Sequence, residues 1–161
     1  MSELPSPLPQ VLLENHPTAF ALLQGDDAHP ELRGELLFYP YQAGSLLAVR
    51  VVGLPHDGFF ALHIHETGDC CTGGDLPFHC AGGHYNPTNT IHPEHAGDLP
   101  VLLSSSGCAY TIVYTGRFRP EQVLGHSVLI HGSPDDYHSQ PAGNSGNRIA
   151  CGVIQGFSAA V

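Results

Sequence analysis

The sequence predicts an all-β fold, a β-barrel or β-sandwich of eight strands with two long functional loops. Eight short runs of apolar or β-branched residues are separated by turn-forming residues, as in antiparallel barrels and sandwiches. No segment keeps a helical period of 3.6 residues over three turns. The chain has 19 glycines and 14 prolines, and only 12% of its residues are charged, which suits short strands and many turns.

The strands are expected where apolar residues follow one another between turns, as in PTAFALLQ, GSLLAVRVVGL and CAYTIVYT. The sequence SSSG at 104–107 predicts a hairpin turn between the fifth and sixth strands. Residues 1–16, with three prolines in the first ten, are expected to be a loose extension, and residues 17–161 a single domain. The eight expected strands cover 17–24, 31–39, 44–54, 59–65, 99–104, 108–115, 126–131 and 149–155.

Two glycine-rich segments, 66–98 and 132–147, interrupt this pattern without strand character. Loops this long inside a compact domain are usually functional or disordered. Both segments contain histidine and aspartate, so we interpret them as functional loops.

The charge balance argues against several classes of partner. The formal net charge is −10, from 15 acidic residues against 5 arginines and no lysine. Binding to nucleic acid or to an anionic membrane relies on lysine and arginine, so neither is expected. No apolar run approaches the ~18–20 residues of a membrane span. The N-terminal segment lacks the basic residues of a signal peptide, which favours the cytoplasm over a periplasmic or secreted location.

The strand at 59–65 ends in His63 and His65, and alternate side chains of a strand share one face. These two imidazoles can therefore hold one ion between them, while Ile64 points into the core. An isolated pair of this kind is more often two partly exposed polar residues. Here the following loop adds further ligand-type residues in AGGHYNPTNTIHPEHAGD, and three imidazoles with one carboxylate can complete a tetrahedral zinc site. These residues are His84, His92, His95 and Asp98, and His131 ends the strand at 126–131.

Five motifs then carry a family resemblance. HIHETGDC, AGGHYNP, HAGDLP, VLIHGSPDD and GNRIACGVIQ follow, in this order, the motif set of the copper–zinc superoxide dismutases. The resemblance covers roughly residues 17–156, and five ordered motifs with compatible spacing make it highly specific. It implies the family's eight-stranded Greek-key β-barrel, in agreement with the number of strands expected from the pattern.

The resemblance implies two metal ions that share a ligand. Asp135 stands where the family has a carboxylate that joins a copper ligand to a zinc ligand, and Arg148 matches the active-site arginine. His84 would bridge both metals as an imidazolate. The implied ligands are His63, His65, His84 and His131 for copper, and His84, His92, His95 and Asp98 for zinc.

The implied activity is the dismutation of superoxide to dioxygen and hydrogen peroxide by a copper ion that changes oxidation state. His84 would carry a proton, and the forked guanidinium of Arg148 would dock the small anion. The alternative is a non-catalytic copper or zinc binding module, or carrier, on the same barrel. Such a relative would be expected to lack a copper ligand or the arginine, and this chain has all of them.

Five cysteines leave at least one without a partner in the chain. The resemblance implies a disulfide between Cys70 and Cys151. Cys71 and Cys80 depart from the family pattern and either form a second bridge or remain free thiols near the metals. Cys108 is expected to be a buried apolar residue. Family members are commonly dimers, so a homodimer is possible, although the sequence identifies no interface patch.

Overall fold

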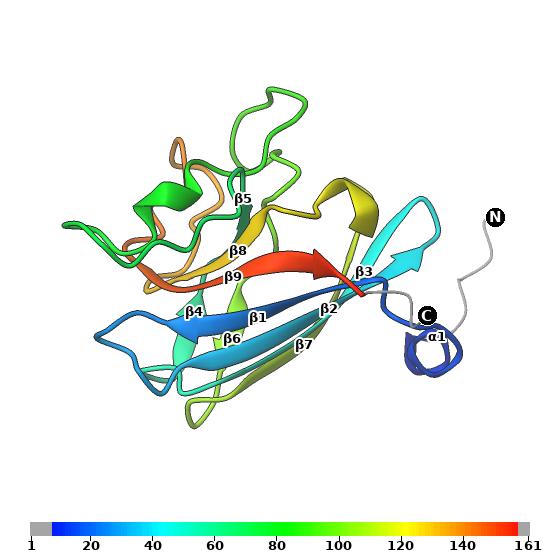
Figure 1. Cartoon of the computed structure of the whole chain (residues 1–161), viewed down its shortest axis with the longest axis horizontal. Helices are drawn as coiled ribbons and strands as arrows, with labels where there is room; N and C mark the ends of the chain where they lie inside the picture. The colour runs from blue at the N-terminus through cyan, green and yellow to red at the C-terminus, as the bar shows by residue number, and fades with distance from the viewer. Residues whose placement is uncertain (1–7, 158–161) are drawn as a thin grey trace.

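The computed structural model of the chain describes residues 8–157, and its largest element is a curled antiparallel sheet of seven strands (Figure 1). The strand order in this sheet is β5-β8-β9-β1-β2-β3-β7, and a second sheet pairs β4 with β6. The strands of the described residues are β1 (Ala19–Gly25), β2 (Arg33–Tyr41), β3 (Gly44–Val52), β4 (Gly58–Phe60), β5 (Leu62–His65), β6 (Leu102–Ser104), β7 (Ala109–Thr115), β8 (Ser127–His131) and β9 (Arg148–Gly156).

The pairing confirms the predicted all-β barrel-like architecture. β1, β2 and β3 form a meander, but β3 pairs next with β7, and β5 pairs with β8. After β3 the chain passes through β4 of the small sheet, β5 at the far edge of the large sheet and β6 of the small sheet before it returns beside β3 at β7, and such a long return connection is typical of a Greek key. Short 3₁₀ turns, η1 (His79–Ala81) and η2 (Pro120–Gln122), lie in the connections.

The strand expected at 59–65 is two strands in the structure. β4 pairs with β6 in the small sheet, whereas β5 pairs with β8 in the large one. Between them, the Ala61 amide donates to the Ser133 carbonyl, and the Ala61 carbonyl accepts from the His131 amide, both at 3.0 Å. These two bonds tie the break to the end of β8, so the described residues contain nine strands where eight were predicted.

One continuous apolar core lies inside the curled sheet. Side chains alternate between this core and solvent along β1, where Ala19, Ala21 and Leu23 are buried. Each fully buried large apolar side chain contributes about 1.5–3 kcal/mol relative to exposure. The largest ones in this core include Leu36, Phe38, Leu47, Phe60 and Ile64.

Two local predictions were wrong. Residues 1–16 were expected to be loose, but Leu8–Glu14 forms helix α1, whose Val11 is buried against Tyr39 and Leu46. This helix of seven residues is too short to show a helical period in the sequence, and residues 1–7 lie outside the described part. Cys108 was expected to be buried, but it is exposed because it closes the Ser105–Cys108 hairpin ahead of β7. The hairpin itself was predicted correctly.

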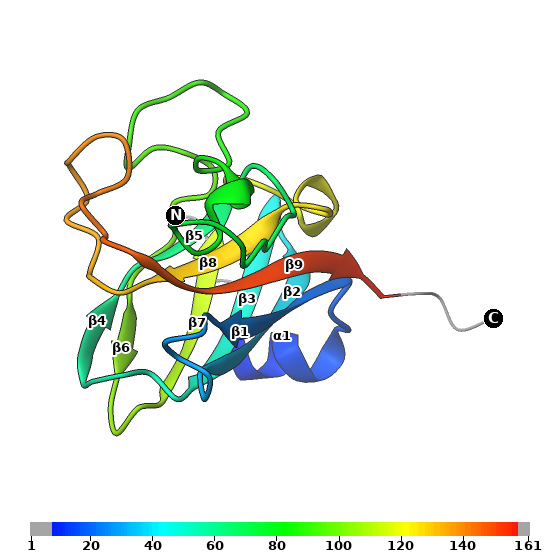
Figure 2. The same ribbon diagram turned by 60° about the vertical axis from the view of Figure 1, so that its left-hand side comes forward.

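The two long loops gather at one end of the barrel. In Figures 1 and 2 the loop 66–98 (green) and the loop 132–147 (orange) both lie beyond β5 and β8, away from α1. Within residues 8–157, no helix is long and apolar enough to cross a membrane.

Candidate metal centre

Seven of the predicted site residues form two adjoining clusters of ligand-type side chains. The four-histidine cluster consists of His63, His65, His84 and His131, and the histidine–aspartate cluster of His84, His92, His95 and Asp98. Within each cluster the ligand atoms lie within 4.8 Å of one another, and every residue is buried. His84 belongs to both clusters, which is the sharing that the family resemblance implies.

Strand β5 supplies the first two histidines. His63 and His65 alternate with Ile64, so both imidazoles face the loops while Ile64 enters the core. β8 covers one edge of this strand. The side chains are therefore fixed by a rigid element rather than by a loop.

The loop 66–98 covers the other edge of β5. Its middle, at residues 84–85, and its end, at residues 97–98, run beside the strand, so that His84 lies opposite His65 and Asp98 opposite His63. The Ile64 amide donates to the Gly97 carbonyl at 2.9 Å, and the Tyr85 amide donates to the Ile64 carbonyl at 2.8 Å. This backbone pairing brings residues that are distant in the sequence into one site.

Close packing at this edge requires a glycine. A Cβ atom at Gly97 would lie 2.3 Å from the Ile64 carbonyl oxygen. Any side chain at position 97 would therefore push the loop, and with it Asp98, away from β5.

His131 reaches the four-histidine cluster from the last position of β8. A β-bulge between Ile130 and His131 interrupts the pairing with β9, and His131 then faces Arg148 across the two strands. Bulges commonly redirect a side chain next to a functional site. The same irregularity thus places both an imidazole and a guanidinium at this end of the barrel.

In the four-histidine cluster, His63, His65 and His131 each have one ring nitrogen within hydrogen-bonding distance of an oxygen atom. His63 Nε2 donates to Asp135 Oδ2 at 2.7 Å, and His65 Nδ1 donates to the Gly82 carbonyl at 2.9 Å. His131 Nδ1 lies 3.3 Å from the Gly146 carbonyl. The second nitrogen of each ring is left facing its neighbours, with His65 Nε2 and His131 Nε2 3.3 Å apart.

Three buried nitrogens make no well-aligned hydrogen bond among the described residues: His63 Nδ1, His84 Nε2 and His92 Nδ1, the last of which lies 3.0 Å from Asp98 Oδ2. Burying an unpaired polar atom is costly, and such atoms are rare unless an ion or water satisfies them. Ligating histidines characteristically give their other nitrogen to a carboxylate or carbonyl. The arrangement therefore fits a metal ion in each cluster.

The two nitrogens of His84 face different clusters. Nδ1 lies 2.7 Å from Asp98 Oδ1 and 3.4 Å from His95 Nδ1, whereas Nε2 is one of the unpaired atoms. The ring centroid of His84 is 4.0 Å from that of His63 in the four-histidine cluster. One imidazole can thus contact two ions.

Asp135 joins the two clusters from the loop 132–147. Its carboxylate accepts from His63 Nε2 at 2.7 Å, from His92 Nε2 at 2.8 Å and from the Tyr137 amide at 2.7 Å. Burial would raise the pKa of Asp135, but these three donors outweigh it and hold the pKa well below its usual range. A carboxylate therefore persists between the clusters at any neutral or mildly acidic pH.

The local environment favours neutral imidazoles, the form that binds metals. Burial lowers the pKa of His63 and, together with the neighbouring His84 and His131, lowers that of His65 further. Burial and His63 lower the pKa of His131 to about 3. For Asp98, contacts with histidines outweigh burial and lower the pKa, so it is a carboxylate.

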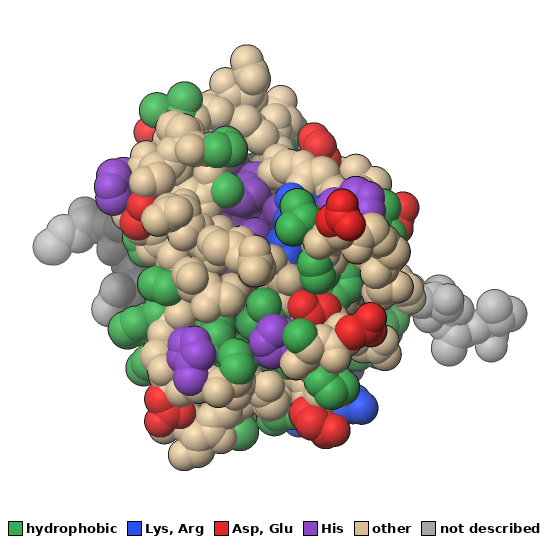
Figure 3. Space-filling view, turned by 90° about the vertical axis from the view of Figure 1, so that its left-hand side faces the viewer, with side chains coloured by type: hydrophobic (Ala, Val, Ile, Leu, Met, Phe, Trp, Pro, Cys, Tyr) green, Lys and Arg blue, Asp and Glu red, His purple; other side chains and the backbone are tan. Residues whose placement is uncertain are grey.

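A cavity of about 550 Å³ opens onto the four-histidine cluster. Figure 3 shows histidine side chains at the bottom of a depression on this face, with a basic side chain beside them. Arg148 lines the cavity and donates to the carbonyls of Phe78 at 2.6 Å and Gly82 at 2.5 Å. These bonds fix the guanidinium at the cavity wall next to His65 and His131.

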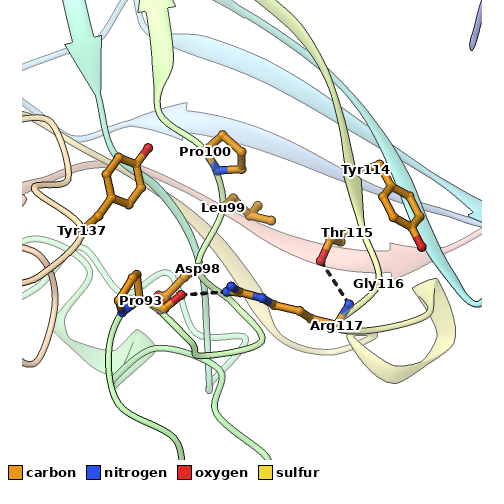
Figure 4. Close-up of a pocket in the computed structure, with 9 residues that line it drawn as sticks. All are labelled: Pro93, Asp98, Leu99, Pro100, Tyr114, Thr115, Gly116, Arg117 and Tyr137. Atoms are coloured by element: carbon orange, nitrogen blue, oxygen red, sulfur yellow. Dashed lines mark hydrogen bonds between the residues drawn. The ribbon is translucent and has the colours of Figure 1, made fainter.

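A second arginine, Arg117, supports the histidine–aspartate cluster from outside. Its Nη1 donates to the Pro93 carbonyl at 2.8 Å and to the His95 carbonyl at 2.9 Å. Figure 4 shows this side chain extended from the segment after β7 toward Pro93 and Asp98, along a surface pocket. Nothing in the sequence pattern singled out Arg117, because its partners are backbone carbonyls.

Other contributors also lacked a sequence signal. The carbonyls of Gly82 and Gly146 orient His65 and His131, and any residue type could supply a carbonyl. Gly143 was part of a glycine-rich loop but was not assigned a role. A Cβ atom there would lie 1.9 Å from Asp135 Oδ1, so the site needs glycine at this position.

Four cysteines form two disulfides in the structure. Cys70 pairs with Cys151, which joins the loop 66–98 to β9, and Cys71 pairs with Cys80 within the loop. Of the two states that the sequence allowed for Cys71 and Cys80, the structure therefore has the bridge. Among the described residues, Cys108 is the free cysteine.

Comparison with known proteins agrees with this geometry. Residues 32–154 match the model of the copper/zinc superoxide dismutase family. The chain is 35% identical over 153 residues to the Cu-Zn superoxide dismutase of Deinococcus radiodurans, with 82% of each protein covered. It is 36% identical over 140 residues to Cu-Zn superoxide dismutase 2 of Aquifex aeolicus, covering 78% of this chain and 80% of the relative.

The fold comparison gives the same result. The structure superposes on the Cu/Zn superoxide dismutase of Brucella abortus with a TM-score of 0.76 at 28% identity, covering 85% of this chain and 99% of the other. With a family match over most of its length and both ligand clusters assembled, the chain belongs to the copper/zinc superoxide dismutase family.

Proposed function

We propose that this chain dismutates superoxide, converting two superoxide anions and two protons into dioxygen and hydrogen peroxide. In this proposal copper binds in the four-histidine cluster and zinc in the histidine–aspartate cluster. The observation that carries the proposal is His84, which directs an unpaired Nε2 to one cluster and Nδ1 to the other.

The four-histidine cluster fits copper. It offers only imidazole nitrogens, which copper accepts in both of its common oxidation states. Bound copper supplies one-electron redox chemistry, since it can oxidise one superoxide and reduce the next. The chain's own contribution is to hold four neutral imidazoles in place through Asp135 and the carbonyls of Gly82 and Gly146.

The histidine–aspartate cluster fits zinc. Three imidazoles and one carboxylate are a common zinc ligand set, and zinc has no redox chemistry. Asp98 is positioned for this role because its Oδ2 accepts from the His95 amide at 3.0 Å. The role of this cluster would be to fix the loop 66–98 and to orient His84.

Arg148 would bind the substrate anion. Its guanidinium keeps its positive charge at any physiological pH, and two of its N–H groups are committed to the carbonyls of Phe78 and Gly82. The remaining donors can face the cavity that it shares with His65, His84 and His131. A small anion would be oriented beside the four-histidine cluster rather than merely attracted to it.

His84 would also serve in proton transfer. Its Nε2 is buried and has no hydrogen-bond partner within the described residues, and the residue lines the same cavity as Arg148. A proton held on Nε2 would lie where the product peroxide must be protonated. The histidine–aspartate cluster, to which Nδ1 belongs, would keep the ring orientation unchanged during this transfer.

A copper or zinc carrier on the same fold is the alternative. A carrier needs ligands that release their ion, and it has no use for an anion-binding group. The buried ligands, the carboxylate that ties both clusters together and the fixed guanidinium in the cavity support the enzyme.

The decisive experiment is stopped-flow decay of superoxide by protein loaded with one copper and one zinc, in the presence of a chelator that masks free copper. We expect turnover by the unmodified chain and by His138→Ala, whose side chain is exposed. His131→Ala should abolish turnover because it removes a ligand of the four-histidine cluster. Stoichiometric metal binding without turnover would support the carrier.

Arg148 can be tested separately from metal binding. Arg148→Ala should keep both metals but slow the reaction roughly tenfold to a hundredfold, since a charged hydrogen bond contributes about 1.5–3 kcal/mol. Metal analysis and the same stopped-flow assay measure the two effects. Unchanged turnover in this variant would remove Arg148 from the proposal.

A homodimer remains a prediction. Tyr110 and Tyr114 on β7 are exposed and share one face of the strand, which would suit a contact between two copies. Sedimentation velocity over a range of concentrations tests it. A dimer that dissociates in Tyr110→Lys would place the contact at β7.

A further inference from the structure

A third group of ligand-type side chains lies outside the two clusters already described. Cys71, His79 and Cys80 each place one ligand atom within 4.8 Å of the others, and the two sulfurs are joined by a disulfide. We propose that, once this disulfide is reduced, these residues form a third metal site for a thiophilic cation such as copper(I) or zinc(II). Thiolates are the ligands that these ions prefer.

The imidazole of His79 is already oriented as a ligand. Its Nδ1 lies 3.1 Å from the Leu76 carbonyl, to which it can only donate, and 3.5 Å from Cys71 Sγ. This bond places the ring proton on Nδ1 and leaves the lone pair on Nε2, which lies 3.6 Å from Cys80 Sγ. Metal-binding histidines show the same pattern, with one nitrogen donating to a carbonyl.

A glycine lies beside the ring of His79. A Cβ atom at Gly74 would lie 3.1 Å from His79 Cε1, so a side chain at position 74 would press on the imidazole. Gly74 has a φ of +104°, a conformation that residues with a side chain rarely adopt. Glycine at position 74 thus leaves free the space beside the imidazole of His79.

The sulfur of Cys71 has a donor that favours its thiolate. The Cys80 amide donates to Cys71 Sγ at 3.3 Å. Hydrogen bonds to a charged acceptor are stronger than those to a neutral one, so this bond would favour the thiolate after reduction. Both cysteines are partly buried and His79 is exposed, so an ion can approach from solvent.

Reduction of Cys71–Cys80 would leave the loop in place. The separate Cys70–Cys151 disulfide ties the same loop to β9, and Phe78 is buried against Leu129 and Cys151. The Phe78 amide donates to the Cys71 carbonyl at 3.0 Å. These contacts hold both ends of the Cys71–Cys80 segment without the bridge, so the two thiols and His79 remain close together.

The site adjoins the substrate cavity. A smaller cavity of about 210 Å³ is lined by Leu76, Pro77, His79, Gly146, Asn147 and Arg148, and Gly146 and Arg148 also line the larger one. An ion bound by Cys71, His79 and Cys80 would therefore sit beside the entrance to the four-histidine cluster.

The chemistry balances with a dithiol as reductant. Thiol–disulfide exchange breaks the Cys71–Cys80 bond and forms one disulfide in the reductant, while its two protons pass to the two cysteine thiols. Binding of the cation then releases two protons as both thiols become thiolates. The disulfide and the bound metal exclude each other, so the redox state of the loop determines whether the site exists.

The test uses the Cys108→Ser variant, which lacks the free thiol. Copper and zinc are first loaded into the two buried clusters. The protein is treated with dithiothreitol and separated from it without oxygen. Mass spectrometry establishes that Cys71–Cys80 is open and Cys70–Cys151 intact. Zinc(II), copper(I) and cobalt(II) are then titrated, with magnesium(II) as a hard-cation control.

We expect one additional thiophilic ion per chain, release of two protons for each zinc, and a thiolate-to-cobalt charge-transfer band. Oxidised protein and Cys71→Ser/Cys80→Ser should bind no additional ion. His79→Ala should bind the additional ion with an affinity at least about tenfold lower. All readouts are independent of superoxide turnover, so they do not depend on the function proposed above.

Three results would overturn the proposal. The reduced protein could take up no further ion, or the double serine variant could bind it equally well. Alternatively, the additional ion could bind only after Cys70–Cys151 has also been opened, which would show that the ligands do not come together in a loop tied to β9.

Discussion

At the scale of single residues, the site depends on the hydrogen-bond partner of the ring nitrogen that each histidine turns away from the proposed metal position. Asp135 is the most connected of these partners, since it accepts from His63 and from His92 and so links the two clusters. A sequence pattern predicts the ligands themselves, because alternate positions on a strand share a face. The pattern does not predict their partners: the family resemblance implies Asp135, and neither the pattern nor the resemblance indicates that Gly82 and Gly146 offer carbonyls.

Asp135→Asn should weaken the binding of both metals. The oxygen of the asparagine amide can accept a hydrogen bond from one imidazole, but its nitrogen cannot accept one from the other. Either His63 or His92 therefore loses the acceptor for the N–H group on the side of its ring that faces away from the metal. Loss of such a partner typically lowers metal affinity 10–100-fold. Competition with a chromophoric chelator measures both affinities.

The neighbouring carboxylate provides the control for this variant. Asp136 accepts from Ser139 and from the His138 amide but contacts neither cluster, so Asp136→Asn should bind both metals normally. Equal affinities in Asp135→Asn and the unmodified chain would contradict the linking role of Asp135.

The metal-free protein should lose stability as the pH falls from about 6.5 toward 3. Unfolded histidine titrates near pH 6.5, whereas the folded structure lowers the pKa of His131 to about 3. Between these values the unfolded chain binds a proton at His131 that the folded chain does not, so acid favours unfolding. Above pH 6.5 this effect is absent.

Thermal unfolding of the metal-free protein across this pH range tests whether its stability falls on acidification. The dependence on pH should become shallower in His131→Gln, which cannot titrate, and should not change in His16→Gln, whose side chain is exposed. A metal-free protein that gains stability on acidification would show that the buried histidines are charged in the folded state.

At the scale of secondary-structure elements, the site is formed where a loop covers a strand edge. β5 lies between β8 and two segments of the loop 66–98, one around His84 and one around Asp98, and its four residues are buried. The sequence predicted the strand and the loop but not the break at Ala61, because one apolar run covers both β4 and β5. Tertiary pairing with two different sheets divides it.

The same limit applies to α1 and to Cys108. α1 forms where Val11 meets the outer face of β2 and β3, a contact that seven residues of sequence do not reveal. Cys108 follows a glycine and precedes an apolar strand, so its orientation depends on the hairpin geometry and not on residue type. Local pattern predicts which segments form strands, and tertiary contacts decide where they end.

Arg117 supports the loop 66–98 from the segment after β7, and its loss should speed the release of zinc. Arg117→Ala removes two hydrogen bonds, to the Pro93 and His95 carbonyls. At about 1 kcal/mol for each bond, release should accelerate roughly tenfold or more. Transfer of zinc to a chelator, followed in time, measures the rate.

Arg119 offers a matched control. It lies two residues away and contacts Glu121 and the Gln42 carbonyl instead, so Arg119→Ala should release zinc at the normal rate. If both variants behaved alike, the support would come from the general charge of this segment and not from the two carbonyl contacts.

At the scale of the whole molecule, the protein carries a strong negative charge while its proposed substrate is an anion. The formal net charge is −10, and the sequence has no lysine. Figure 3 shows acidic side chains on the face that holds the depression, and few basic ones. The residues that line the larger cavity include, besides histidines, one basic residue, Arg148, and one acidic residue, Glu66.

Turnover should therefore be insensitive to added salt or should rise with it. Salt screens the repulsion between an acidic protein and superoxide, whereas a positive funnel would make the rate fall. Glu66→Gln should speed turnover at low ionic strength, and Glu31→Gln, at an exposed position away from the cavity, should not. A steep fall in rate with salt would reveal an attractive field that the charge distribution does not predict.

In the proposed site His84 would be a ligand of two different metal ions, and anomalous X-ray diffraction from crystals loaded with copper and zinc tests this sharing. Data collected at the absorption edges of the two elements locate each ion independently. We expect copper among His63, His65, His84 and His131, and zinc among His84, His92, His95 and Asp98. A single metal position, or a copper peak outside the four-histidine cluster, would contradict the account.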